Sequence, residues 1–277
     1  MIVIVEILCA GNELLSGITL NSNAHWLAGQ IAQAGGMVRR VTVVRDDLEE
    51  ISSAIKESLA REPDILITTG GLGATYDDLT LEGTAMALGK KTKLDDRAVG
   101  MLKKSYARRR SLGHHHNYEL NEVRLKMATI PEGSTPIQNP VGSAPAVMDR
   151  SGSTRIFCLP GVPSEMQAIF SEHILPAIKE SVGEFVIKEI NYDVRGVTEA
   201  MIAPALVRIV ESHPRQAVYL KTHPRGYFRK KTPQIRVQVV SRGNNEKEVK
   251  KRLNSIAKII EKEVAKLGGR IIITNTT

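Results

Sequence analysis

The pattern of apolar and polar residues in the first half of the chain is that of an alternating α/β domain. Residues Ile2 to Cys9 form a nearly continuous apolar run, which is typical of a strand buried on both faces. A helix is predicted from about Asn23 to Ala34, and it ends at the Gly35-Gly36 pair. Its apolar residues recur at helical spacing, at Ala24, Leu27, Ala28 and Ile31.

The strand and helix pattern then repeats. Met37 to Val44 is extended, and Asp47 followed by Glu50 resembles a capping box that starts a second helix. Pro63 closes that segment, and Asp64 to Thr69 is predicted to be another buried strand. Two βα units with short connections imply parallel strands and right-handed crossovers. Because such sheets bind ligands at the carboxyl ends of their strands, the segments after the strands are the first candidates for a site.

The segment after this strand contains a glycine-rich turn within the run TTGGLGATYDDLT, residues 68–80. Gly70, Gly71 and Gly73 allow backbone conformations and a close ligand approach that residues with side chains resist. Their N–H groups can face a phosphate, and a helix that opens near Leu79 would add its positive end. The turn is therefore predicted to bind an anion, with Thr80 as a hydroxyl donor.

The same segment carries two adjacent carboxylates, Asp77 and Asp78. Two like charges side by side are unfavourable unless a cation, a proton or hydrogen-bond donors compensate them. Together with the glycine turn they predict a phosphate bridged by a divalent metal ion. The alternative is that Asp78 caps a helix and Asp77 is a solvated turn residue.

The loop after the first strand reaches the same edge of the sheet. It carries Glu13 and the amides of Asn12 and Asn23, which suit a metal ion or a ribose hydroxyl. The asparagines equally suit turns and the cap of the following helix. Both interpretations stay open for this loop.

Three later positions carry further candidate chemistry. Ser143 lies in the rigid turn Asn139 to Pro145, and Gly161 precedes a helix that starts at about Ser164, a second possible anion site. The run His114-His115-His116 is a weak metal candidate, because three consecutive side chains converge on one ion only with an unusual backbone.

Composition predicts two domains and a cytoplasmic protein. A chain of 277 residues exceeds the usual size of one hydrophobic core, and it shows no signal peptide or bilayer-spanning run. Cys9 and Cys158 lie in apolar runs without CxxC spacing, as buried hydrophobic residues do. The net charge of +8 divides into −2 for residues 1–175 and +10 for residues 176–277. A basic surface suits nucleic acid, a nucleotide or an acidic partner, although most such surfaces are simply solvated.

Four motifs occur in order along the chain: GNELLSG (11–17), TGGLGATYDDLT (69–80), NPVGSAP (139–145) and LPGVPSEM (159–166). With them the chain resembles the N-terminal region of the CinA family, which is related to the molybdopterin-binding fold of the MoaB/Mog group. The resemblance is strong to about Ala177. It continues more weakly through the basic half, which looks like the KH-like domain of that family.

The resemblance implies a three-layer MoaB/Mog-like α/β domain with a mostly parallel sheet over residues 1–177. A smaller basic, KH-like α+β domain is expected over residues 178–277. The expected strands there are Phe185 to Val194, Val218 to His223 and Gln234 to Ser241, and the expected helices are Glu199 to Glu211 and Glu246 to Leu267.

The resemblance also implies a function. We expect a domain that binds a phosphorylated nucleotide or pterin beside Mg²⁺ or a similar ion and hydrolyses the pyrophosphate of ADP-ribose or a related nucleotide. Glu13, Asp77 and Asp78 are the expected metal ligands and catalytic residues. The chain ends before the family's C-terminal deamidase domain, so we expect no deamidase activity.

Two departures from the family pattern concern the site itself. Ala74 stands where a proline is common, and Asn12 stands where an aspartate is common, which leaves Glu13 as the acidic ligand of that loop. Two other functions stay open: a non-catalytic or transferase-type molybdopterin-binding protein, and an RNA-binding protein. RNA is the weakest of these because the basic half lacks a GxxG loop with basic flanks. Relatives of this fold self-associate, so a homo-oligomer is expected.

Overall fold

The apolar run at the start of the chain forms β1 (Ile4–Ala10), around which the first sheet is built. In the computed structural model, β1 pairs in parallel with β2 (Met37–Val44) and, on its other side, with β3 (Ile65–Thr69). The remaining strands follow beyond β3 in the order β8 (Thr154–Leu159), β7 (Ala146–Ser151) and β6 (Thr135–Ile137). β8 is parallel to β3, β7 is antiparallel to β8, and β6 is antiparallel to β7. The expectation of an α/β domain with a mostly parallel sheet is confirmed.

The structure describes residues 3–112, 119–214, 217–228 and 231–276. The predicted histidine candidates, His114, His115 and His116, lie outside these residues. The chain forms two units, Met1–Val182 and Gly183–Thr277, which are treated separately below.

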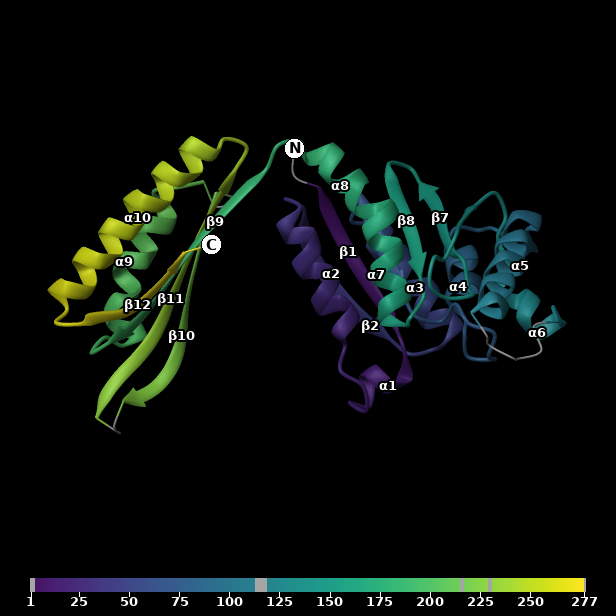
Figure 1. Ribbon diagram of the computed structural model, residues 1–277, viewed down its shortest axis with the longest axis horizontal. Coiled ribbons are helices and arrows are strands. Elements are labelled where there is room, and N and C mark those ends of the chain that lie inside the picture. Colours follow the sequence, from purple (N-terminus) through teal and green to yellow (C-terminus); the bar gives the residue numbers. More distant parts are fainter. Residues whose placement is uncertain (1–2, 113–118, 215–216, 229–230, 277) are drawn as a thin grey trace. The chain divides into compact units, whose positions relative to one another are not determined.

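Helices cover both faces of the first sheet (Figure 1). α2 (Ser22–Gln33) packs with α7 (Pro163–Ile169) and α8 (Leu175–Val182), while α3 (Leu48–Leu59) packs with α4 (Thr80–Ala87). Because β2 and β3 lie on opposite sides of β1, right-handed crossovers place α2 and α3 on opposite faces. This explains why six of the seven residues of β1 are buried.

The other elements of this unit lie outside the six-stranded sheet. β4 (Thr92–Leu94) and β5 (Thr129–Pro131) pair as a small antiparallel sheet. The helices nearby are α5 (Asp96–Ser111) and α6 (Glu122–Leu125), and α1 (Asn12–Leu15) is a single turn after β1. Short 3-10 and π-helical turns occupy residues 126–128 and 170–174.

Side-chain caps fix the starts of two helices. Asp47 accepts hydrogen bonds from the N–H groups of Glu49 and Glu50, which confirms the predicted start of α3. Asp95 accepts from the N–H groups of Arg97 and Ala98 and is the N-cap of α5.

A buried carboxylate near the start of β1 is fully paired. Glu6 is 2% exposed and lies 2.8 Å from Arg61 and 2.9 Å from Arg39, and it also accepts the hydroxyl proton of Ser58. Burial raises the pKa of Glu6, but the hydrogen bonds from Arg61, Ser58 and Arg39 outweigh that effect and lower the pKa to about 2. This cluster ties β1, β2 and the end of α3 together.

The second unit is an antiparallel sheet with two long helices. Its strand order is β10-β11-β9-β12, with bounds β9 (Val186–Arg195), β10 (Val218–Phe228), β11 (Thr232–Gly243) and β12 (Arg270–Thr276). α9 (Glu199–Glu211) packs on β10, and α10 (Glu246–Lys266) packs on β11 and β9. The predicted strands and helices are all present, and β12 is an additional strand. Assignment of this unit as KH-like stays a prediction.

Within the described residues, the helices are all too short or too polar to pass through a lipid bilayer.

Candidate functional site

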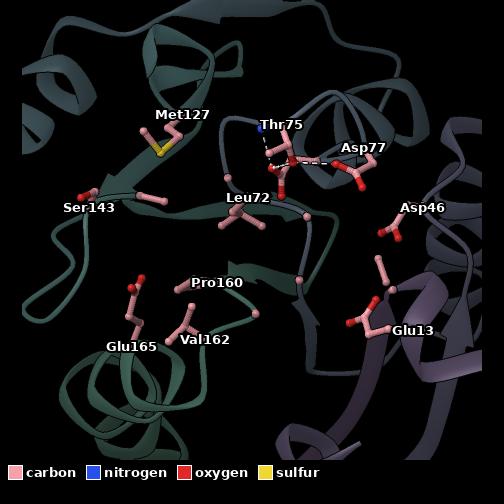
Figure 2. Close-up of a pocket in the computed structure, with 18 of the residues that line it drawn as sticks. Glu13, Asp46, Leu72, Thr75, Asp77, Met127, Ser143, Pro160, Val162 and Glu165 are labelled. Atoms are coloured by element: carbon pink, nitrogen blue, oxygen red, sulfur yellow. Dashed lines mark hydrogen bonds between the residues drawn. The ribbon is translucent and has the colours of Figure 1, made fainter. Parts of the chain in front are cut away.

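A pocket of about 450 Å³ opens at the carboxyl ends of the parallel strands, where the chain's path across the sheet reverses between β1 and β3 (Figure 2). The loops after β1, β2, β3 and β8 all contribute to its wall, and so does the turn before β7. The lining residues used below are Glu13, Asp46, Gly70, Gly71, Leu72, Gly73, Thr75, Asp77, Asp78, Arg109, Met127, Ser143, Pro160, Gly161, Val162 and Glu165.

The glycine turn has the backbone geometry that only glycine adopts easily. Gly70 has a φ of 101°, and a Cβ there would lie 2.3 Å from the carbonyl oxygen of Ala10. Gly71 has a φ of 66°, and a Cβ there would lie 2.4 Å from the hydroxyl of Thr80. The turn can therefore pass close beneath the pocket only because both side chains are absent.

Thr80 has a structural position rather than the predicted contact with a ligand. It is fully buried, its hydroxyl donates to the carbonyl oxygen of Gly70 at 2.8 Å, and its N–H donates to that of Gly71 at 3.1 Å. The first residue of α4 therefore holds the glycine turn in place. Its hydroxyl proton is already used, so Thr80 is not a phosphate donor in this geometry.

Asp77 and Asp78 lie over the turn and share Thr75 as a partner. Asp78 accepts from the N–H of Thr75 at 2.8 Å and also from its hydroxyl, and Asp77 accepts from the same hydroxyl at 2.6 Å. A Cβ at Gly73 would lie 2.5 Å from Asp78, so that glycine makes room for the carboxylate. The N-cap of α4 is Leu79, without a side-chain cap, so the alternative role of Asp78 as a helix cap is wrong.

The floor of the pocket is a network of direct contacts between the loops after β3 and β8. Asn23 donates to the hydroxyl of Thr69 at 3.0 Å and to the carbonyl oxygen of Gly161 at 2.8 Å. Thr69 donates in turn to the carbonyl oxygen of Pro160 at 3.1 Å. A Cβ on Gly161 would lie 3.3 Å from the Cα of Gly70, so the two backbones are in contact. Asn23 therefore supports the floor of the site from α2.

Four carboxylates from three loops line one side of the pocket: Glu13, Asp46, Asp77 and Asp78. Burial raises the pKa of Asp46. The hydrogen bond from the N–H of Asn12 lowers this pKa, and the charges of Glu13, Asp77 and Asp78 raise it again. The hydrogen bond from Thr75 lowers the pKa of Asp77, helped by its own backbone N–H and the charge of Lys126. Lys126 itself donates to the carbonyl oxygen of Thr75 at 2.6 Å.

The donor chemistry of this side fits a hard divalent cation, since carboxylate oxygens are the ligands that Mg²⁺ prefers. Within the described part of the chain, however, no three His, Cys, Asp or Glu side chains are grouped closely enough to hold a metal ion. Glu13 shares the pocket with Asp77 and Asp78, but a preformed three-carboxylate cage is not present. Mg²⁺ commonly uses one or two carboxylates together with substrate phosphates and water, so these residues fit an ion that arrives with its ligand.

The opposite side of the pocket has a different character. Leu72, Met127, Pro160 and Val162 are apolar, and Ser143 and Glu165 add polar groups among them (Figure 2). Arg109 is the one cationic residue among the described residues that line the pocket. The neighbouring Arg108 donates to the carbonyl oxygens of Pro140, Val141 and Gly142, which fixes the turn that carries Ser143.

The sequence prediction located most of this pocket. Glu13, Gly70, Gly71, Gly73, Asp77, Asp78, Ser143 and Gly161 all line it, whereas Asn12, Asn23 and Thr80 do not. Asn12 is exposed, and its backbone N–H donates to Asp46 at 2.9 Å. The roles predicted for these residues in binding and catalysis stay predictions.

Four lining residues with polar or charged side chains were not predicted: Asp46, Thr75, Arg109 and Glu165. Asp46 had a usable signal, because it follows β2 and therefore lies at the same edge of the sheet. Glu165 had one as well, in the motif LPGVPSEM at the end of β8. Arg109 lies in a helix that no periodicity connects to the site.

Comparison with known proteins gives one family. Residues 6–180 match the model of the family described as probable molybdopterin binding domain. A protein of Metallosphaera sedula is 38% identical over 271 residues, which is 98% of each chain, and one of Sulfurisphaera tokodaii is 39% identical over 267 residues, covering 96% of this chain and 97% of the other. Among solved structures, the protein CinA of unknown function from Thermoplasma acidophilum is 38% identical with a TM-score of 0.55. It covers 64% of this chain and 98% of its own.

Proposed function

This chain belongs to the molybdopterin-binding-domain family, and we propose that its pocket binds a phosphorylated nucleotide with a divalent cation and hydrolyses the pyrophosphate of ADP-ribose or a similar nucleoside diphosphate compound. The observation that carries this proposal is the placement of a glycine-rich turn and four carboxylates in one pocket. A phosphate at the turn and carboxylates beside it repel each other, so a cation between them is required. Similarity to CinA supports the comparison with that family.

One set of residues binds the phosphate, and another holds the cation that balances its charge. The N–H groups of Gly71 and Gly73 bind one phosphate of the pyrophosphate, whereas the N–H of Gly70 already donates to the carbonyl oxygen of Leu159 at 3.1 Å. Asp77 and Asp78 hold the cation from the adjacent turn, with Glu13 and Asp46 facing the same space. Bound there, a divalent ion neutralises the phosphates and lowers the pKa of a water molecule. Thr75 orients both aspartates through its hydroxyl.

A second candidate is favoured by the family match alone. A molybdopterin-type compound also carries a phosphate beside a flat ring, so the same turn would bind it without hydrolysis. The self-association expected from the resemblance would suit either function and stays a prediction.

The direct test is hydrolysis of ADP-ribose by the full chain with Mg²⁺, Mn²⁺ or Co²⁺, measured as release of AMP. We expect Asp78→Asn to lower the rate by about 100-fold or more, because one charge is lost from the cation site. Asp96→Asn is the matched control, since Asp96 is exposed in α5 and lies outside the pocket, and it should leave the rate unchanged.

Two results would overturn the hydrolase. The first is no AMP release with any of the three ions, and the second is equal activity of the Asp78→Asn protein. Metal-dependent binding of a phosphorylated pterin without turnover would then support the second candidate.

A further inference from the structure

The apolar side of the pocket contains a carboxylate that the surrounding structure fixes in place. Glu165, in the first turn of α7, accepts a hydrogen bond on Oε2 from Nδ2 of Asn139 at 2.7 Å. Asn139 is fully buried, and its remaining bonds go to backbone groups of its own turn, at Val141, Gly142 and Ala144. The amide that holds Glu165 therefore has one fixed orientation.

A glycine is also needed for this arrangement. A Cβ at Gly142 would lie 1.9 Å from Cδ of Glu165, so the carboxylate occupies the space that any other residue at 142 would fill. Two segments far apart in the sequence, the NPVGSAP turn and the start of α7, are thus fitted to each other around one carboxylate.

This carboxylate has capacity left for a ligand. Among the described residues, Asn139 is its one hydrogen-bond partner, and no Lys, Arg or His side chain pairs with it. An ionised carboxylate accepts hydrogen bonds and donates none, so a ligand that binds here must supply N–H or O–H groups. Figure 2 shows Glu165 with Pro160 and Val162 on the side of the pocket away from Asp46 and Asp77.

The neighbouring groups define the shape and polarity of that partner. Leu72 and Met127 are 3% and 8% exposed, and with Pro160 and Val162 they give the apolar walls that suit a flat ring. Ser143, the residue after Gly142, adds a hydroxyl group to the same pocket. A ring with two adjacent N–H donors and a neighbouring oxo group matches this set.

We propose that Glu165 is a specificity-determining residue that recognises a 2-amino-4-oxopyrimidine edge, as in guanine and pterins, in preference to adenine. Two parallel N–H groups on such an edge match a carboxylate as the two donors of a guanidinium do. Adenine offers its amino group only, beside ring nitrogens that are acceptors and face the carboxylate unfavourably. This inference rests on the proposed phosphate-binding function and replaces the adenine ring of ADP-ribose by a guanine-type ring in the preferred ligand.

The test is calorimetric binding of GDP and ADP to the full chain in Mg²⁺, with no hydrolysis required. We expect GDP to bind at least about 10-fold more tightly than ADP. Glu165→Gln presents an amide donor to the ligand's N–H groups, so GDP affinity should fall about 10- to 100-fold while ADP affinity changes little. The matched control is Glu172→Gln, at a 61% exposed side chain outside the pocket, which should leave both affinities unchanged.

A second variant tests the geometry without removing the charge. Gly142→Ala displaces the carboxylate, so it should reduce the same preference in a protein whose circular dichroism is unchanged. Neopterin monophosphate in place of GDP separates the two sources of this ring chemistry, since it carries the edge without a purine nucleoside. If it binds more tightly than GDP and loses that affinity in Glu165→Gln, the edge belongs to a pterin.

The outcomes separate this inference from the hydrolase. Equal affinity of the native protein for GDP, neopterin monophosphate and ADP, or an unchanged preference in Glu165→Gln, overturns the role of Glu165 even if ADP-ribose is hydrolysed. Glu165-dependent binding without any hydrolysis supports the role of Glu165 and contradicts the hydrolase. Absence of binding by all three compounds overturns the role of Glu165, whereas the hydrolase is tested by AMP release from ADP-ribose.

Discussion

Carboxylates near the two ends of β1 have opposite electrostatic surroundings. Near its start, Glu6 is buried between Arg39 and Arg61, and the pKa of that carboxyl is lowered to about 2. Beyond its other end, Asp46 lies among Glu13, Asp77 and Asp78, and burial together with those charges raises its pKa. The molecule supplies internal cations where a carboxylate holds the fold together. Among the described residues, no Lys or Arg forms an ion pair with the four pocket carboxylates, although the charge of Lys126 lowers the pKa of Asp77, and such a set suits an external cation.

The largest expected effect in this comparison comes from Glu6→Gln. A pKa lowered from 4.5 to about 2 corresponds to about 3 kcal/mol of folding free energy at neutral pH. Because the folded pKa lies below the unfolded one, this contribution is complete above pH 4.5 and is lost as the pH falls toward 2. Urea unfolding at pH 7 should show the variant about 3 kcal/mol less stable, with the difference shrinking below pH 4.5. An equal difference at pH 7 and pH 3 would contradict the paired-carboxylate explanation.

The glycine turn gives the next effect. Gly70→Ala places a Cβ 2.3 Å from a backbone carbonyl at a φ of 101°, and we expect a loss of about 2–3 kcal/mol in unfolding free energy. Gly17→Ala is the control, because Gly17 has a φ of 75° but no atom within 4 Å of its Cβ position, and it should cost about 1 kcal/mol. Thermal unfolding of both variants measures the difference, and similar losses would mean that close backbone packing beneath the pocket is unimportant.

Asp46→Asn has the smallest expected effect on folding stability. The sign of this effect differs between solutions without and with divalent ions. Without divalent ions, removal of one of four neighbouring charges should stabilise the fold by up to about 1 kcal/mol. The asparagine can still accept the N–H of Asn12, so the loop stays in place. In Mg²⁺ the native protein should gain more stability than the variant, measured as the shift in melting temperature. If none of Mg²⁺, Mn²⁺ and Co²⁺ raises the melting temperature of the native protein, the four carboxylates are not a cation site.

The sequence predicted the elements and the edge of the sheet better than the roles of single residues. Buried strands and amphipathic helices have a strong periodic signal, so the bounds of β1, α2, β2 and β3 lie within two residues of the predicted ones. α3 begins directly after its predicted cap, Asp47. The strands β4 and β5, of three residues each, are too short to show a period, and they were not predicted. The seven-residue strand β12 was not predicted either.

Within the site, local patterns could not show which way a side chain points. Thr80 follows the glycine turn as a ligand donor would, yet its hydroxyl closes back on Gly70. Asp78 precedes a helix as a cap would, yet it bonds to Thr75 instead. The contact of Glu165 with Asn139 joins residues 26 positions apart, and only the folded chain brings them together.

The hydrogen bonds of Asn23 and Thr69 join α2, β3 and the loop after β8 into one unit beneath the pocket. The floor of the pocket can change shape on ligand binding only if several of these hydrogen bonds break at once. Any change of shape on ligand binding is therefore expected in the walls of the pocket, and the floor should keep its form.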